Sequence, residues 1–127
     1  MKHTVYLIGG KTEYQEAIFK HWGVPEVKRC SVACDEQKRA KALMLTFDGE
    51  SFSYDRLLDI YVSNVSAHPT KRTQIICNDS GAFYSLSHLV TEYLDIAGDA
   101  NGKPIRISVI LSNVDYNKPN RRIAKCI

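Results

Sequence analysis

The stretch Ile75-Ile76-Cys77-Asn78-Asp79-Ser80-Gly81-Ala82 decides the fold that the sequence predicts. Its apolar first part has the composition of a short buried strand, and its polar second part opens a long amphipathic helix. A strand that leads directly into a helix is the repeating unit of α/β folds. The same alternation of strand-like and helix-like segments extends outward from this stretch toward both ends of the chain.

The periodicity of apolar residues predicts five strands and three helices. The expected strands cover residues 3–8, 27–33, 42–47, 73–77 and 104–112, and residues 35–41 form a short charged stretch. The expected helices cover residues 12–22, 53–65 and 80–97, and Tyr14, Ala17, Ile18 and Trp22 share one apolar face of the first. Helices between strands indicate crossover connections. The prediction is an α/β fold with a mostly parallel central sheet of four to five strands and helices on both faces.

The composition is that of a globular protein rather than a disordered or disulfide-rich one. The chain has 127 residues, of which 44% are hydrophobic and 24% are charged. No apolar run approaches the roughly 18 residues of a membrane span, so no membrane contact is expected. The first apolar run, residues 5–8, is too short for a signal-peptide core, which predicts a cytoplasmic or intracellular protein. The oligomeric state stays open.

The charge and the cysteines limit the kinds of partner. All fourteen acidic residues lie within residues 1–115, where the net charge is −1, and residues 116–127 carry four basic residues and no acid. We therefore expect one α/β domain over residues 1–115 and a basic tail over 116–127, and nucleic-acid binding is not expected. The cysteines, Cys30, Cys34, Cys77 and Cys126, lack zinc-site spacing and are expected to be free thiols. No metal and no cofactor is expected.

The strand–loop–helix unit at residues 75–82 also has the pattern of an anion site. In a parallel sheet, ligands bind beyond the carboxyl ends of the strands, where this loop would lie. The first backbone amides of a helix have no partner within the helix, and its dipole attracts negative charge. The same field favours the thiolate of Cys77. The predicted phosphate-binding residues are those of the loop and first turn, namely Asn78, Asp79, Ser80, Gly81 and Ala82.

Over about residues 4–97 the chain resembles the compact dual-specificity branch of the cysteine-dependent protein tyrosine phosphatases. The matching features are Tyr6-Leu7-Ile8-Gly9-Gly10, Trp22-Gly23-Val24-Pro25-Glu26-Val27, Leu45-Thr46-Phe47-Asp48 and Gln74-Ile75-Ile76-Cys77. The resemblance implies a phosphatase-like fold, Cys77 as the nucleophile and Asp48, which lies 29 positions before it, as the general acid. The partner would be a phosphorylated protein or a small phosphate ligand.

The phosphate loop of that family departs from its usual pattern in this chain. The family has an arginine six residues after the cysteine, and this sequence has Phe83 there. A phenylalanine ring does not replace the planar guanidinium that binds two phosphate oxygens. The sequence thus predicts a phosphatase-like domain, catalytically degenerate, that binds a phosphate-bearing ligand or partner. Whether it is an enzyme stays open.

Two alternatives remain at this point. One is a small regulatory or protein-interaction protein that acts through surface contacts and the basic tail, with Lys118, Arg121, Arg122 and Lys125 as the contact residues. The other is a nucleotide-binding module that uses the turn Gly9-Gly10-Lys11. That turn has neither of the usual glycine-rich phosphate-binding spacings.

Overall fold

The structure of the chain is a computed structural model that describes residues 2–33, 39–94 and 102–112. In chain order its elements are β1 (Lys2–Ile8), α1 (Thr12–His21), β2 (Glu26–Ala33), β3 (Arg39–Asp48), α2 (Tyr54–Ala67), β4 (Gln74–Cys77), α3 (Ser80–Leu94) and β5 (Ser108–Leu111). The predicted α/β class is confirmed. No helix within the described ranges is long and apolar enough to cross a membrane.

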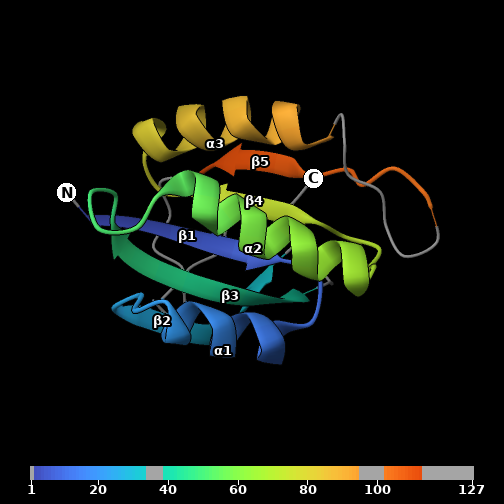
Figure 1. The fold of residues 1–127 in the computed structure, drawn as a ribbon, viewed down its shortest axis with the longest axis horizontal. Helices are drawn as coiled ribbons and strands as arrows, with labels where there is room; N and C mark the ends of the chain where they lie inside the picture. Colours follow the sequence, from blue (N-terminus) through green and yellow to red (C-terminus); the bar gives the residue numbers. More distant parts are fainter. Residues whose placement is uncertain (1, 34–38, 95–101, 113–127) are drawn as a thin grey trace.

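The five described strands form one sheet in the order β2-β3-β1-β4-β5 (Figure 1). The central strand β1 runs antiparallel to both β3 and β4, and β2 runs antiparallel to β3. Within the described sheet, β4 and β5 are the one parallel pair. The expectation of a mostly parallel sheet is therefore wrong. Each helical crossover does join parallel strands, but the units β1-α1-β2 and β3-α2-β4 interleave, as in a ferredoxin-like arrangement.

The three described helices cover one face of the sheet, whereas the sequence predicted helices on both faces (Figure 1). Alternate residues of β1 show this plainly. Val5 and Leu7 pack in one cluster with helix residues such as Leu57 and Leu86, and Tyr6 belongs to a second cluster on the opposite face. The second βαβ unit reverses both the strand direction and the direction of travel across the sheet. Right-handed crossovers then place both helices on the same side.

Local signals explain where the elements begin. Ser53 caps α2, because its side-chain oxygen accepts a hydrogen bond from the Arg56 N–H at 3.2 Å. The cap of α1 is Lys11, which makes no side-chain cap bond, although Thr12 and Gln15 have capping-box spacing.

β3 begins at Arg39, three residues earlier than expected. Arg39 and Lys41 are exposed and Ala40 between them is half-buried, which is the alternation of a strand.

Candidate functional site

The predicted catalytic cysteine lies at the end of β4, on the sheet face that the helices cover. Cys77 has no exposed surface. Burial, followed by the negative charge of Asp79, raises the pKa of its thiol to about 12. Desolvation therefore outweighs the helix field that the sequence analysis expected to favour a thiolate. A protonated thiol sealed beneath a helix does not act as a nucleophile toward an external substrate.

The loop that follows Cys77 is closed by the carboxylate of one of its own residues, Asp79. Asp79 Oδ1 accepts a hydrogen bond from the Ala82 N–H at 2.8 Å, and the Asp79 carbonyl accepts one from Phe83 at 3.1 Å. Asp79 thus caps α3 and occupies the place where an external anion would bind. Of the other predicted loop residues, Asn78 is half-buried, Ser80 and Gly81 are exposed, and Ala82 is buried in the core.

A histidine that the sequence analysis did not select completes this end of the sheet. Nδ1 of His3 lies 3.0 Å from Oδ2 of Asp79, and its ring packs against Phe47 and Tyr54. Partial burial raises the pKa of Asp79, but hydrogen bonds from His3 and from the amides of Ala82 and Gly81 outweigh burial, so the net pKa is lowered. No sequence motif links residues 3 and 79, which meet because β1 and β4 pair.

Asp48, the predicted general acid, ends β3 at the same end of the sheet as Cys77. Its Oδ1 accepts a hydrogen bond from the Glu50 N–H at 3.0 Å, and this bond is the main reason that the pKa of Asp48 is lowered. Its carbonyl accepts hydrogen bonds from Ser51 and Phe52. Its carboxyl is therefore held as a charged turn residue, whereas a general acid needs a pKa near the working pH.

Other predicted residues lie outside the described part of the chain. These are the tail residues Lys118, Arg121, Arg122 and Lys125, and two of the four cysteines, Cys34 and Cys126. Within residues 2–33, 39–94 and 102–112, no group of three or more histidine, cysteine, aspartate or glutamate residues is placed to hold a metal ion.

The turn after β1 lies at the opposite end of the sheet and holds a buried network of amides. Gly9 and Gly10 have φ values of 113° and 73°, which a side chain would disfavour. Asn64 Oδ1 accepts hydrogen bonds from the Lys11 N–H at 2.6 Å and from Gln15 Nε2 at 2.9 Å. Gln15 Nε2 also donates to the Gly9 carbonyl at 2.8 Å. This network fixes the start of α1 against α2.

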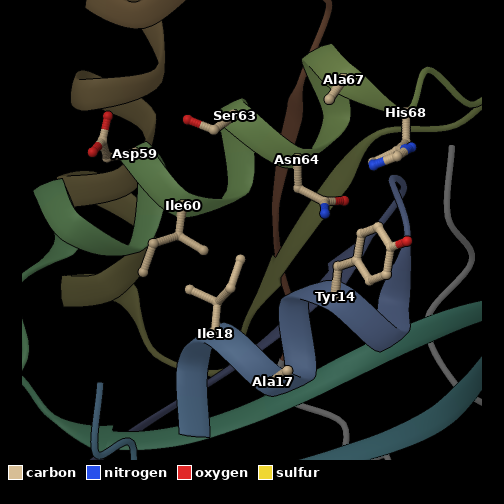
Figure 2. A pocket seen from close by; sticks show the side chains of 9 residues that line it. All are labelled: Tyr14, Ala17, Ile18, Asp59, Ile60, Ser63, Asn64, Ala67 and His68. Carbon is tan, nitrogen blue, oxygen red and sulfur yellow. The ribbon is translucent and has the colours of Figure 1, made fainter. Parts of the chain in front are cut away.

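A groove of about 510 Å³ runs between α1 and α2 beside this network (Figure 2). In Figure 2 the side chains of Ile18 and Ile60 point toward each other in its middle, and Tyr14 and His68 close one end. The rings of Tyr14 and His68 meet edge to face, with centroids 5.4 Å apart. The remaining lining residues are Ala17, Asp59, Ser63, Asn64 and Ala67.

The groove combines apolar walls with a few polar groups, as small-ligand sites do. Tyr14 is 50% exposed and Ile18 is 38% exposed, so the floor is open to solvent. Because Asn64 Oδ1 already accepts two hydrogen bonds, the carboxamide nitrogen is the group that this side chain offers to a ligand. Nζ of Lys11 lies 4.4 Å from the centre of the Tyr14 ring and places a positive charge at this end.

The sequence contained a signal for this groove, namely an apolar face on the first helix. The spacing of apolar residues does not tell whether such a face lines a groove or packs in the core. Tyr14, Ile18 and Trp22 were placed on one apolar face of the helix, yet all three are substantially exposed. At the far end of α1, the Arg56 guanidinium lies over the ring of Trp22, and its Cζ atom is 4.1 Å from the centre of that ring. Helical spacing shows that residues share a face and leaves open whether another element covers it.

Comparison with known proteins shows the class of fold. No protein-family model matches the chain, and no curated protein matches it in sequence. Among solved structures it is similar to Mxr1 from Saccharomyces cerevisiae in an unusual oxidized form. The TM-score is 0.67 and the identity 12%, over 87% of this chain and 72% of that one. A second similar structure is Mxr1 in complex with Trx2. Here the TM-score is 0.65 and the identity 14%, over 94% of this chain and 81% of that one.

These similarities correct the phosphatase resemblance. Mxr1 is a methionine sulfoxide reductase, and the described fold is similar to it rather than to a phosphatase. The expected phosphatase-like, phosphate-binding domain is therefore wrong. The two alternatives, a protein that interacts through surface contacts and the basic tail and a nucleotide-binding module, do not match these neighbours either. The strand, turn and helix spacings that carried the resemblance are local features, and different strand orders share them.

Proposed function

We propose that this protein binds the side chain of an oxidised methionine residue, methionine sulfoxide, in the α1–α2 groove. One observation carries the proposal: the groove joins open apolar walls, formed by Ile18 and Ile60, to hydrogen-bond donors at one end. A methionine sulfoxide side chain has the matching shape, with apolar methylene and methyl groups around one strongly accepting oxygen. The similarity in fold to the methionine sulfoxide reductase Mxr1 supports this choice of ligand.

The donors of the groove suit a sulfoxide oxygen. The carboxamide nitrogen of Asn64 and the hydroxyl of Tyr14 belong to residues that line it at that end. A thioether sulfur is a much weaker acceptor than a sulfoxide oxygen, so these donors favour the oxidised side chain. The apolar walls contribute to the binding of both forms. The groove is therefore expected to distinguish the two forms through its polar end.

The described thiols favour recognition of the sulfoxide over its reduction. Reduction by a cysteine requires a thiolate that takes the sulfoxide oxygen and, with one proton from solvent, becomes a sulfenic acid as the S–O bond of the substrate breaks and the thioether is released. Burial raises the pKa of Cys30 to about 11, and that of Cys77 to about 12. Cys30 also packs with the cluster on the sheet face opposite the helices, away from the groove. Neither described thiol is placed for this reaction.

The test compares two ligands that differ by one oxygen atom. N-acetyl-methionine sulfoxide methylamide and its thioether parent are titrated into the isotope-labelled protein, and amide shifts of α1 and α2 are followed by NMR. We expect the sulfoxide to bind at least about 5-fold more tightly and to shift the amides that flank the groove. Equal binding of the two ligands, or shifts confined to other elements, would contradict the proposal.

Matched variants locate the binding in the groove. Ile18→Asp places a charge in the exposed middle of the groove and is expected to weaken sulfoxide binding at least 10-fold. Tyr84→Asp is the control, because Tyr84 is 70% exposed on α3, outside the groove. A parallel assay with dithiothreitol measures conversion of the sulfoxide to the thioether. If the wild-type protein converts the sulfoxide and Cys30→Ser abolishes this conversion, the protein is a reductase and the recognition role is overturned.

A further inference from the structure

A second cavity, which we call the cationic cavity, lies where the loop before β4 meets the segment before β5. Its volume is about 270 Å³, and its lining is Lys71, Arg72, Thr73, Gln74, Arg106 and Ser108. Three of these six side chains are cationic, and none of the six is acidic. Its lining therefore has the charge and the hydrogen-bond donors that recognise anionic groups.

The backbone around this cavity is fixed by hydrogen bonds that join its two walls. The hydroxyl of Thr73 donates to the carbonyl of Arg106, and the Ser108 N–H donates to the Thr73 carbonyl at 3.1 Å. From there β4 and β5 continue as a parallel pair, with Gln74 opposite Ser108. The positions from which Lys71 and Arg106 project are therefore set by the fold before any ligand arrives.

The cationic cavity lies at the same end of the sheet as the α1–α2 groove. Thr70 accepts a hydrogen bond from the Gly10 N–H at 3.2 Å and donates one to the Arg72 carbonyl at 3.1 Å. The chain that carries Lys71 and Arg72 thus rests on the glycine turn that opens α1. Lys11, which follows Gly10 in the chain, places its side-chain nitrogen over the Tyr14 ring at the end of the groove.

The separation between the two sites suits a short extended peptide. The hydrogen bond from the Gly10 N–H to Thr70 joins the turn that leads into α1 to the loop that carries Lys71. Because an extended chain advances about 3.3 Å per residue, a peptide of a few residues is expected to span the two sites. A polypeptide whose oxidised methionine occupies the groove would place nearby residues at the cationic cavity.

We infer that the cationic cavity binds glutamate or aspartate side chains that lie within a few residues of the oxidised methionine in a polypeptide. This inference rests on the proposed function and adds the class of substrate, namely acidic sequences that contain a methionine sulfoxide. The planar guanidinium of Arg106 matches the two oxygens of a carboxylate, and Lys71 adds a second positive charge. Because these side chains reach solvent, the attraction weakens as salt rises.

The test uses three peptides of equal length that carry four acidic or neutral residues around one central residue. The first has methionine sulfoxide with glutamates, the second has methionine sulfoxide with glutamines, and the third has norleucine with glutamates. Binding is measured by calorimetry at low and at high salt. We expect the first peptide to bind at least about 10-fold more tightly than the second at low salt, with a smaller advantage at high salt.

Variants assign the effect to the cationic cavity. Lys71→Ala with Arg106→Ala is expected to remove the advantage of the glutamate peptide and leave the glutamine peptide unchanged. Lys2→Ala with Lys20→Ala is the control, because it removes two exposed positive charges outside the cationic cavity, one at the first residue of β1 and one in the last turn of α1. An equal loss in the control pair would show general electrostatic attraction and overturn the inference.

The outcomes for the two proposals differ. If the two sulfoxide peptides bind equally and Ile18→Asp still weakens both, the cationic cavity has no role and the sulfoxide groove stands. If the norleucine peptide binds as tightly as its sulfoxide counterpart and both depend on Lys71 and Arg106, the sulfoxide proposal fails and the carboxylate site stands. Loss of all binding differences would overturn both.

Discussion

At the residue scale, two glycines determine how α1 meets the rest of the fold. Gly9 approaches the Arg72 carbonyl so closely that a Cβ atom there would lie 2.7 Å from its oxygen. A Cβ atom on Gly10 would lie 2.1 Å from Asn64 Oδ1, inside the buried network of amides. Any side chain at these positions would separate the start of α1 from α2 and from the loop that carries Lys71. Both proposed sites depend on this contact.

Gly10→Ala is expected to destabilise the protein by about 2–5 kcal/mol, because it combines a disfavoured backbone conformation with overpacking. Gly23→Ala is the matched control: Gly23 has a φ of 81°, but a Cβ atom there meets nothing within 4 Å. Its expected cost is about 1–2 kcal/mol, from the left-handed conformation alone. Urea unfolding of both variants measures the difference. Equal costs would show that the amide network tolerates a methyl group.

At the element scale, α3 shows why a good sequence signal for an anion site was misleading. A strand, a polar loop and a long helix do follow one another at residues 74–94, as predicted. The residue that opens the helix is an aspartate, and its carboxylate binds the first turn and His3. Sequence spacing located the helix start correctly. Only the folded structure shows that this start is already occupied and that Cys77 is sealed.

The charge of Asp79 is expected to make α3 sensitive to acid. Because the folded-state pKa of Asp79 is lowered, its carboxylate stabilises the native state above about pH 4, and this contribution is lost as pH falls through the folded pKa. Asp79→Asn retains a capping side chain without the charge. We expect wild type to exceed this variant in unfolding free energy at pH 6 by less than about 1 kcal/mol, since solvent screens the pair.

The measurement is a series of urea unfolding curves between pH 2.5 and pH 6. The difference between wild type and Asp79→Asn should shrink toward the acidic end of the series. Asp79→Ser, which also caps a helix without charge, should behave in the same way. A difference that stays constant with pH would show that the carboxylate charge contributes nothing and that packing alone accounts for the effect.

At the scale of the whole molecule, the central strands are buried on both faces, although the described helices cover only one. Leu43 and Met44 are neighbours in β3 whose side chains point to opposite faces, and each is 1% exposed. Such strands read as continuous apolar runs, a pattern typical of parallel sheets that are covered on both faces. The same pattern arises in this mostly antiparallel sheet because both of its faces are buried.

Truncation at both faces of β3 tests this arrangement. Leu43→Ala and Met44→Ala are each expected to destabilise the protein by about 2–5 kcal/mol, because each removes a fully buried side chain. A sheet with one solvent-facing side would instead lose stability only with Leu43→Ala. Thermal and urea unfolding of the two variants, with exposed Lys41→Ala as the control, measure the costs. A small cost for Met44→Ala would contradict burial of the second face.

Much of the fold could be predicted from local patterns, and the sites could not. The sequence alone determined the α/β class, three helices close to their observed bounds, and the turn at Gly9, because periodicity and turn chemistry act between near neighbours. The tertiary structure alone decided the strand order, the antiparallel pairing and the single helical layer. These depend on contacts between residues far apart in sequence, such as His3 with Asp79 and Gln15 with Asn64. The α1–α2 groove and the cationic cavity arise from such contacts, so only the folded chain shows them.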